Sequence, residues 1–172
     1  DAAHLAKLDA FGLTMIEQPL SYADIWEHSL LQKELATPLC LDESIHDLAD
    51  FRAAVALGAC RVLNLKEGRV GGLLESLRLL AFARERGIPV WSGGMDETGI
   101  GRAVNIHLQT VDGFTLPGDT SETSRYFHED LVAPPVVLDA EGFVEVPAGA
   151  GIGVEVIPER LERFTLRTER LK

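Results

Sequence analysis

The stretch RVLNLKEGRVGG, residues 61–72, predicts a short buried strand that ends at Lys66 and is followed by a glycine-rich turn. Two earlier stretches have the same form: PLCLDES ends its apolar run at Asp42, and TMIEQPL ends its run at Glu17. The three residues are 25 and 24 positions apart, the length of one βα unit. A parallel barrel keeps its chemistry at the carboxyl ends of its strands. Two carboxylates and a lysine meeting there indicate a metal site with a base beside it.

The same period continues along the chain. IPVWSGG ends at Gly93 and Gly94, and FTLPGD ends at Asp119, which makes five strand ends. Apolar residues at helical spacing separate the strands and predict helices over 23–36, 47–57, 73–86 and 98–111. A further helix is expected over 2–11, before a strand at 13–17. Strands that alternate with helices in this way predict an α/β fold with a parallel sheet.

The number of units suggests an incomplete barrel. A closed eight-stranded barrel needs roughly 250 residues, whereas this sequence has 172. We therefore expect the C-terminal part of a TIM-like barrel, about five βα units. An open five-stranded α/β sheet is the alternative.

Composition restricts the classes of function. The net charge of −11 argues against nucleic-acid binding, which relies on Lys and Arg at phosphates. No apolar run approaches the roughly 18 residues of a membrane span. The only cysteines, Cys40 and Cys60, each lie in or beside a predicted buried strand and are interpreted as small core residues in a reducing compartment.

The chain changes character after the barrel-like part. Residues 1–130 are assigned to the barrel, and residues 131–172 to a tail with short strands and a terminal helix near 158–163. The stretches VVLD, FVEVP and GVEVI supply those short strands between prolines and glycines. GRVGG, after Lys66, suits either a plain turn or a phosphate cradle at a helix N-terminus.

Five motifs in order carry a resemblance to a known family. IEQPL, LDES, NLKEGRVGG, PVWSGGMDETGIGRAVN and FTLPGDTSETSRY resemble the barrel domain of the enolase superfamily, muconate-lactonizing subgroup. Within it the sequence is most similar to the o-succinylbenzoate synthase/N-acylamino acid racemase family. The resemblance implies a (β/α)7β barrel whose chain returns at its C-terminus to an N-terminal capping domain. That capping domain and the first barrel strands are not in this sequence.

The resemblance also implies roles for individual residues. Glu17 and Asp42 match carboxylates that bind a divalent cation, which is Mg²⁺ or, as the alternative, Mn²⁺ or another divalent ion. Lys66 matches the acid/base lysine. Such enzymes stabilise an enediolate formed by removal of an α-proton from a carboxylate. Glu43 and Asn64 are expected just behind these groups. Four further residues are expected to line the substrate pocket: Gly93, Gly94, Met95 and Tyr126.

The family's Lys-x-Lys strand and first metal-binding Asp should precede Glu17 by roughly 51 and 25 residues. Only 16 residues precede Glu17, so the chain alone is expected to be inactive. For the parent enzyme we expect dehydration to o-succinylbenzoate in menaquinone biosynthesis, racemisation of N-acylamino acids, or both. A dipeptide epimerase or muconate-type cycloisomerase is the alternative within the superfamily, and a non-catalytic barrel fragment is the alternative of another class. We also expect a cytoplasmic homo-oligomer that acts on a small carboxylate and binds neither nucleic acid nor membrane.

Overall fold

A computed structural model of the chain describes residues 2–170, so the ends of the two predicted domain ranges, residue 1 and residues 171–172, lie outside it. The described residues form two compact units. The first contains residues 2–93 and 112–118, and the second contains residues 94–111 and 119–170.

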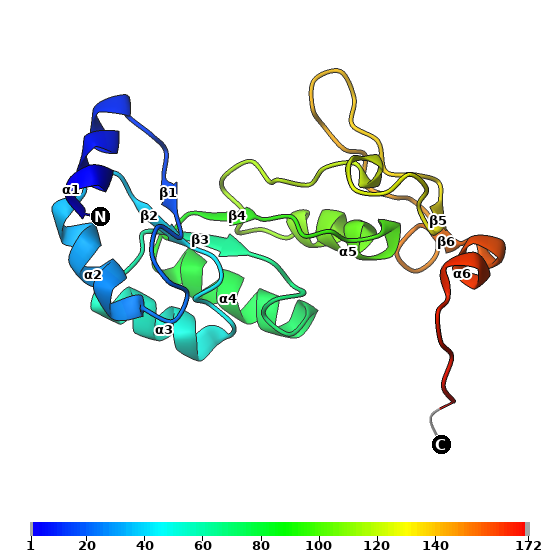
Figure 1. Cartoon of the computed structure of the whole chain (residues 1–172), viewed down its shortest axis with the longest axis horizontal. Helices are drawn as coiled ribbons and strands as arrows, with labels where there is room; N and C mark the ends of the chain where they lie inside the picture. Colours follow the sequence, from blue (N-terminus) through cyan, green and yellow to red (C-terminus); the bar gives the residue numbers. More distant parts are fainter. Residues whose placement is uncertain (1, 171–172) are drawn as a thin grey trace. The chain divides into compact units, whose positions relative to one another are not determined.

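The first unit contains a parallel four-stranded sheet in the order β1-β2-β3-β4. Its strands are β1 (Ile16–Glu17), β2 (Leu39–Leu41), β3 (Val62–Leu65) and β4 (Val90–Ser92). Three helices connect successive strands: α2 (Ile25–Glu34), α3 (Leu48–Leu57) and α4 (Leu73–Glu85). Figure 1 shows these helices side by side along the sheet. Each of the first three strands is therefore followed by a helix that returns the chain to the start of the next strand, as in the βα units predicted from the sequence.

Local sequence sets the helix ends. The Asp24 carboxylate accepts a hydrogen bond from the Glu27 N–H at 2.9 Å and caps α2, and Asp47 does the same for α3 through the Asp50 N–H. Gly58 ends α3 in the left-handed conformation, at φ +70°. These residues fix where α2 and α3 begin and where α3 ends.

The core of this unit lies around the two central strands. Every residue of β2 and β3 is buried, as expected for parallel strands that are covered on both faces. Cys40 and Cys60 are both free and buried, and burial raises the pKa of each thiol to about 12. Their placement agrees with the interpretation of both as core residues.

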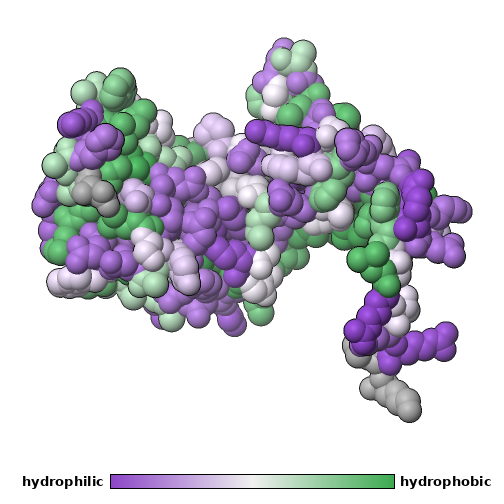
Figure 2. Space-filling view, in the orientation of Figure 1, coloured by the Kyte–Doolittle hydropathy of each residue, from purple (hydrophilic) through white to green (hydrophobic). Residues whose placement is uncertain are grey.

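The N-terminal segment differs from the single helix that was expected. It consists of α1 (Ala2–Leu5) followed by the 3₁₀ helix η1 (Ala6–Phe11), and Gly12 ends it at φ +60°. Two apolar residues beside it stay exposed, Phe11 by 73% and Leu13 by 41%. Figure 2 shows apolar surface over this end of the chain.

The second unit is built around α5 (Gly99–Gln109). The Asp130 carboxylate accepts from the Gly99 N–H at 2.8 Å, and the fully buried Arg102 forms an ion pair with Glu97 at 3.1 Å. The remaining elements are short: η2 (Thr123–Arg125), β5 (Val132–Ala133), β6 (Glu155–Val156) and α6 (Pro158–Phe164). Strands β5 and β6 pair antiparallel.

Two expectations about strands were wrong. FTLPGD does not form a fifth strand, although the N–H groups of Thr115 and Leu116 both donate to the Val90 carbonyl. Pro117 lacks the N–H that would extend this pairing. In the tail, VVLD and FVEVP contribute only an isolated bridge between Leu138 and Val144.

None of the helices within residues 2–170 has the length and apolar character that a membrane span requires.

Candidate active site

The carboxyl ends of the first three strands bring Glu17, Asp42 and Lys66 together. Glu17 is the last residue of β1, and Asp42 and Lys66 directly follow β2 and β3. The parallel register aligns Glu17 with Cys40 and Cys40 with Val62, so the three strands end at one edge of the sheet. The Lys66 ammonium donates to Asp42 Oδ2 at 2.7 Å. The Asn64 amide, from β3, donates to Glu17 Oε1 at 2.5 Å.

Asp42 is the most buried of the acidic groups at this edge. It is 4% exposed, and it forms ion pairs with both Lys66 and Arg69. Arg69 also donates to two backbone carbonyls, those of Ile45 and Asn64. Burial lowers the pKa of the Arg69 guanidinium, and the negative charge of Asp42 opposes that shift. Arg69 thus fixes the Asp42 carboxylate from one side while Lys66 contacts it from the other.

Glu17 is in a less favourable electrostatic position. Its pKa is raised, chiefly because burial removes water from the carboxylate and also because Asp42 is close. The hydrogen bond from Asn64 and the positive charge of Lys66 act in the opposite direction. A cation between the two carboxylates would relieve their repulsion.

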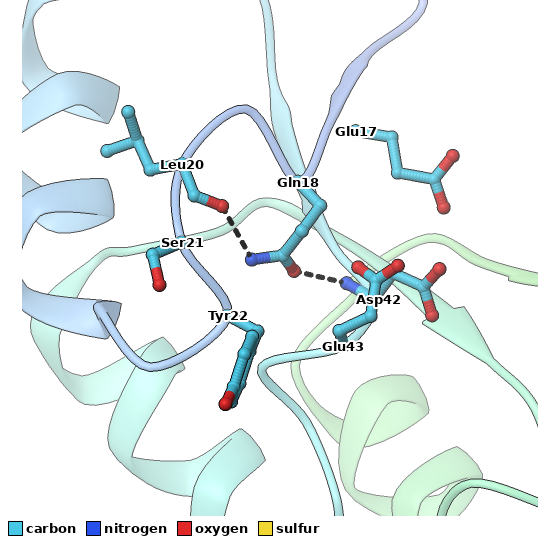
Figure 3. Close-up of a pocket in the computed structure, with 7 residues that line it drawn as sticks. All are labelled: Glu17, Gln18, Leu20, Ser21, Tyr22, Asp42 and Glu43. Carbon is cyan, nitrogen blue, oxygen red and sulfur yellow. Dashed lines mark hydrogen bonds between the residues drawn. The ribbon is translucent and has the colours of Figure 1, made fainter.

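A cavity of about 540 Å³ opens beside these carboxylates. Figure 3 shows its lining, which comes from the end of β1, the loop before α2 and the end of β2: Glu17, Gln18, Leu20, Ser21, Tyr22, Asp42 and Glu43. Glu43, expected behind the metal ligands, is exposed and faces this cavity with its neighbours. The cavity gives a small molecule access to the strand ends.

Gly93, which follows β4, leaves room for the site. A Cβ atom on Gly93 would lie 2.2 Å from Asn64 Oδ1 and 2.5 Å from Lys66 Cε. The position therefore requires glycine to let the Lys66 side chain pass. The Asn64 Oδ1 atom is buried and has no hydrogen-bond partner among residues 2–170.

Three of the residues predicted to line the substrate pocket belong to the second unit. Gly94 is packed against the Asp119 carbonyl, which a Cβ atom would approach to 2.5 Å. Met95 is 44% exposed and Tyr126 is 38% exposed. The Ser121 hydroxyl donates to the Tyr126 hydroxyl at 3.2 Å. Within this unit they lie on the loop before α5 and at the end of η2.

Sequence reasoning missed two polar residues of the first unit, Arg69 and Gln18. Arg69 lies in the turn after Lys66, where the GRVGG motif drew attention only to its glycines. Gln18 lies between Glu17 and Pro19, and its amide contacts the backbone at the end of β2. Each of the two is a long polar side chain within a strand-end motif, and this feature of the sequence could have indicated them.

The donor set suits a hard divalent cation in part. Carboxylate oxygens are the preferred ligands of Mg²⁺, and Glu17 and Asp42 supply them. The side chains of the candidate site include three carboxylates and two cationic groups. The carboxylates are Glu17, Asp42 and Glu43, and the cationic groups are Lys66 and Arg69. However, no group of three or more His, Cys, Asp or Glu side chains that could hold a metal ion occurs within residues 2–170. The assignment of Glu17 and Asp42 as cation ligands stays a prediction.

Comparisons with known proteins place the chain in a family. Residues 1–160 match the family described as enolase C-terminal domain-like. The chain is 50% identical over 165 residues to an o-succinylbenzoate synthase from Geobacillus kaustophilus, covering 96% of this chain and 44% of that protein. It is 52% identical over 165 residues to an N-succinylamino acid racemase from Thermus thermophilus, covering 95% and 44%.

A solved structure gives the same result for the fold. An enolase superfamily member from Listeria innocua superposes with a TM-score of 0.93 at 43% identity, covering 98% of this chain and 45% of that one. The likeness confirms the predicted α/β class and favours the barrel over an open sheet. The chain spans about 44% of the length of the curated relatives named above. With its strand-end carboxylates and lysine in the predicted order, the chain belongs to the enolase C-terminal domain-like family.

Proposed function

We propose that the protein containing this chain removes a proton from the carbon next to a substrate carboxylate, with Lys66 as the acid/base group. Glu17 and Asp42 would hold a divalent cation, Mg²⁺ or in its place Mn²⁺. Such a cation, when bound, supplies positive charge that stabilises the enediolate. The observation that carries this proposal is the contact of the Lys66 ammonium with Asp42, at 2.7 Å, beside the Asn64–Glu17 pair.

The residues of the site have separate roles in this scheme. In its neutral amine form, Lys66 takes the α-proton at Nζ, and the ammonium formed in this way returns the proton. The Lys66 side chain is 17% exposed, so little water competes for that proton. Asp42 and Arg69 orient Lys66 through the shared carboxylate. Asn64 holds Glu17, and the cavity beside Glu17 and Glu43 admits the substrate.

The names of the relatives suggest two reactions, and both begin with the same proton removal. One is dehydration that forms o-succinylbenzoate, a step of menaquinone biosynthesis, and the other is racemisation of N-succinylamino acids. Dipeptide epimerisation and muconate-type cycloisomerisation use the same kind of groups and stay as alternatives. As further parts of the proposal we retain a cytoplasmic location, to which two free buried cysteines are suited, and assembly into a homo-oligomer.

Cation binding by the isolated chain should be weak. Glu17 and Asp42 supply two anionic ligands, so a bound cation would retain more of its water. Calorimetric titration of the chain with Mg²⁺ measures this directly. An affinity that is unaffected by changing both Glu17→Gln and Asp42→Asn would contradict the assignment of these ligands.

A chimera tests the whole activity. In the Thermus thermophilus racemase, the 165-residue region matched at 52% identity is replaced by this chain. We expect the chimera to racemise an N-succinylamino acid and to dehydrate the hydroxylated precursor of o-succinylbenzoate, and to lose both activities with Asp42→Asn. A folded chimera that shows neither activity, or that works equally well with Asp42→Asn, would refute the proposal. Assays with a dipeptide and with muconate distinguish the alternatives.

A further inference from the structure

Gln18 has an unusual backbone conformation beside the proposed cation ligands. It is the only non-glycine residue with positive φ among residues 2–170, at +37°. It directly follows Glu17 and precedes Pro19. Non-glycine residues avoid this region, and they persist there when the surrounding contacts hold them, often at functional sites.

The side chain of Gln18 supplies those contacts. Its Oε1 atom accepts from the backbone N–H groups of Asp42, at 2.9 Å, and Ser44, at 3.3 Å. Its Nε2 atom donates to the Ser44 hydroxyl at 2.7 Å and to the Leu20 carbonyl at 3.4 Å. Figure 3 shows the amide between the loop that carries Leu20 and the backbone of Asp42. Both ends of the amide are therefore used.

A buried histidine lies behind the amide. His28 is fully buried, and its Nδ1 atom lies 2.6 Å from the Asp24 carbonyl, so Nδ1 carries the proton. Its Nε2 atom accepts from the Leu20 N–H at 3.3 Å and lies 3.5 Å from Gln18 Nε2. This arrangement presents an acceptor to the NH₂ side of the Gln18 amide. The orientation with Oε1 toward Asp42 is thereby favoured.

We propose that Gln18 is a positioning residue whose amide ties the end of β1 to the end of β2 and thereby sets the spacing of Glu17 and Asp42. The inference rests on the proposed function, because the spacing matters only if the two carboxylates share a cation. The Gln18 N–H also donates to the Cys40 carbonyl at 2.9 Å, so backbone and side chain join the same two strand ends. Asp42 is then fixed at its backbone by Gln18 and at its carboxylate by Lys66 and Arg69.

The chain contains a matched control at the other end of β2. Gln32 is buried, its Oε1 atom accepts from the Leu39 N–H at 2.7 Å, and its Nε2 atom donates to the Thr37 carbonyl at 3.2 Å. It therefore bridges backbone groups at the start of the strand as Gln18 does at its end. A purely structural role for Gln18 predicts that the two glutamines behave alike.

The test compares Mn²⁺ binding by the chain and its variants Gln18→Met, Gln18→Gly and Gln32→Met. Glycine adopts φ +37° without strain, so Gln18→Gly removes the amide without straining the backbone. This variant serves as the test if Gln18→Met fails to fold. Free Mn²⁺ is measured by electron paramagnetic resonance, the amide exchange of Asp42 and Ser44 by mass spectrometry, and the folded state by thermal melting.

We expect both Gln18 variants to bind Mn²⁺ at least about 10-fold more weakly, the effect typical of residues that orient metal ligands. Exchange of the Asp42 and Ser44 amides should accelerate in the same variants. Gln32→Met should lower the melting temperature and leave Mn²⁺ affinity unchanged. Unaltered Mn²⁺ affinity in a folded Gln18→Gly chain, or an equal loss in Gln32→Met, would overturn the inference. If the unsubstituted chain binds Mn²⁺ no better than a Glu17→Gln, Asp42→Asn variant, the proposed cation site fails, and this inference fails with it.

Discussion

The surroundings of Glu17 favour its protonated form in the folded chain. Its pKa is raised above its ordinary value of 4.5, chiefly by burial and further by Asp42. The folded state therefore binds the Glu17 proton more tightly than the unfolded state does, and stability falls as pH rises through the interval between 4.5 and the raised value. Active sites commonly retain such unfavourable charges because function requires them.

The variant Glu17→Gln should consequently stabilise the chain at pH 7 in the absence of divalent cations. The Gln carbonyl can still accept from Asn64, so the hydrogen bond is kept and the charge is lost. The gain should disappear when the pH is lowered well below 4.5, where Glu17 is protonated in both the folded and the unfolded state. Thermal melts at the two pH values measure this, with Glu43→Gln as the control for loss of a charge at the cavity. A Glu17→Gln chain that melts no higher than the parent at pH 7 would contradict the electrostatic account.

The residues that sequence reasoning could find were those whose place follows from strand order. Glu17, Asp42 and Lys66 come at the end of apolar runs one βα unit apart, and a parallel sheet brings such ends to one edge. Gln18 and Arg69 could not be found in this way. The role of Gln18 depends on a positive φ and on a contact with the Asp42 N–H, 24 residues away. The role of Arg69 depends on an ion pair with the Asp42 carboxylate, 27 residues away. The spacing of apolar residues encodes neither contact.

At the level of elements, the glycine directly after β4 leaves room for side chains of the site. Gly93→Ala would place a methyl group within 2.5 Å of both the Asn64 amide and the Lys66 side chain. We expect it to lower the free energy of unfolding by about 1–3 kcal/mol, as overpacking of a filled region does. It should also displace Lys66 from Asp42. Urea unfolding measures the first effect.

Ser92→Ala is the control for Gly93→Ala. Ser92 is fully buried, and its hydroxyl has no partner within residues 2–170, so its removal adds no atoms and breaks no hydrogen bond of the described chain. We expect little change in stability. Equal effects of the two substitutions would show that space at Gly93 is not the limiting factor.

The helices were easier to predict than the strands. The predicted helix over 47–57 corresponds to α3 (Leu48–Leu57), since Asp47 and Gly58 mark its ends chemically. The run FTLPGD has the apolar character of a strand but contains a proline, and its pairing with Val90 ends after Leu116. The number of strands in the sheet was therefore overestimated by one.

At the level of the whole molecule, the sheet has an open edge at β1. Within residues 2–170, β2 is the only strand that pairs with β1, whereas Thr115 and Leu116 contact the strand at the other edge. An open edge beside apolar surface favours association with a second chain. We expect the isolated chain to self-associate.

Sedimentation velocity over a range of concentrations measures this association. Leu13→Lys, in the exposed segment before β1, should weaken it, whereas Leu166→Lys in the exposed C-terminal segment should not. A chain that sediments as a monomer at every concentration would contradict the prediction.

The central claim, that Lys66 moves the α-proton, is tested most directly by hydrogen exchange into each substrate enantiomer in D₂O. The racemase chimera defined above serves as the enzyme, with Lys66→Ala as the variant and Lys33→Ala, an exposed lysine of α2, as the control. We expect Lys66→Ala to slow exchange of one enantiomer by about 10²- to 10⁴-fold, the usual contribution of a general base. Exchange of the other enantiomer should continue, and Lys33→Ala should change neither. Equal slowing of both enantiomers by Lys66→Ala, with fold and cation binding intact, would contradict the claim.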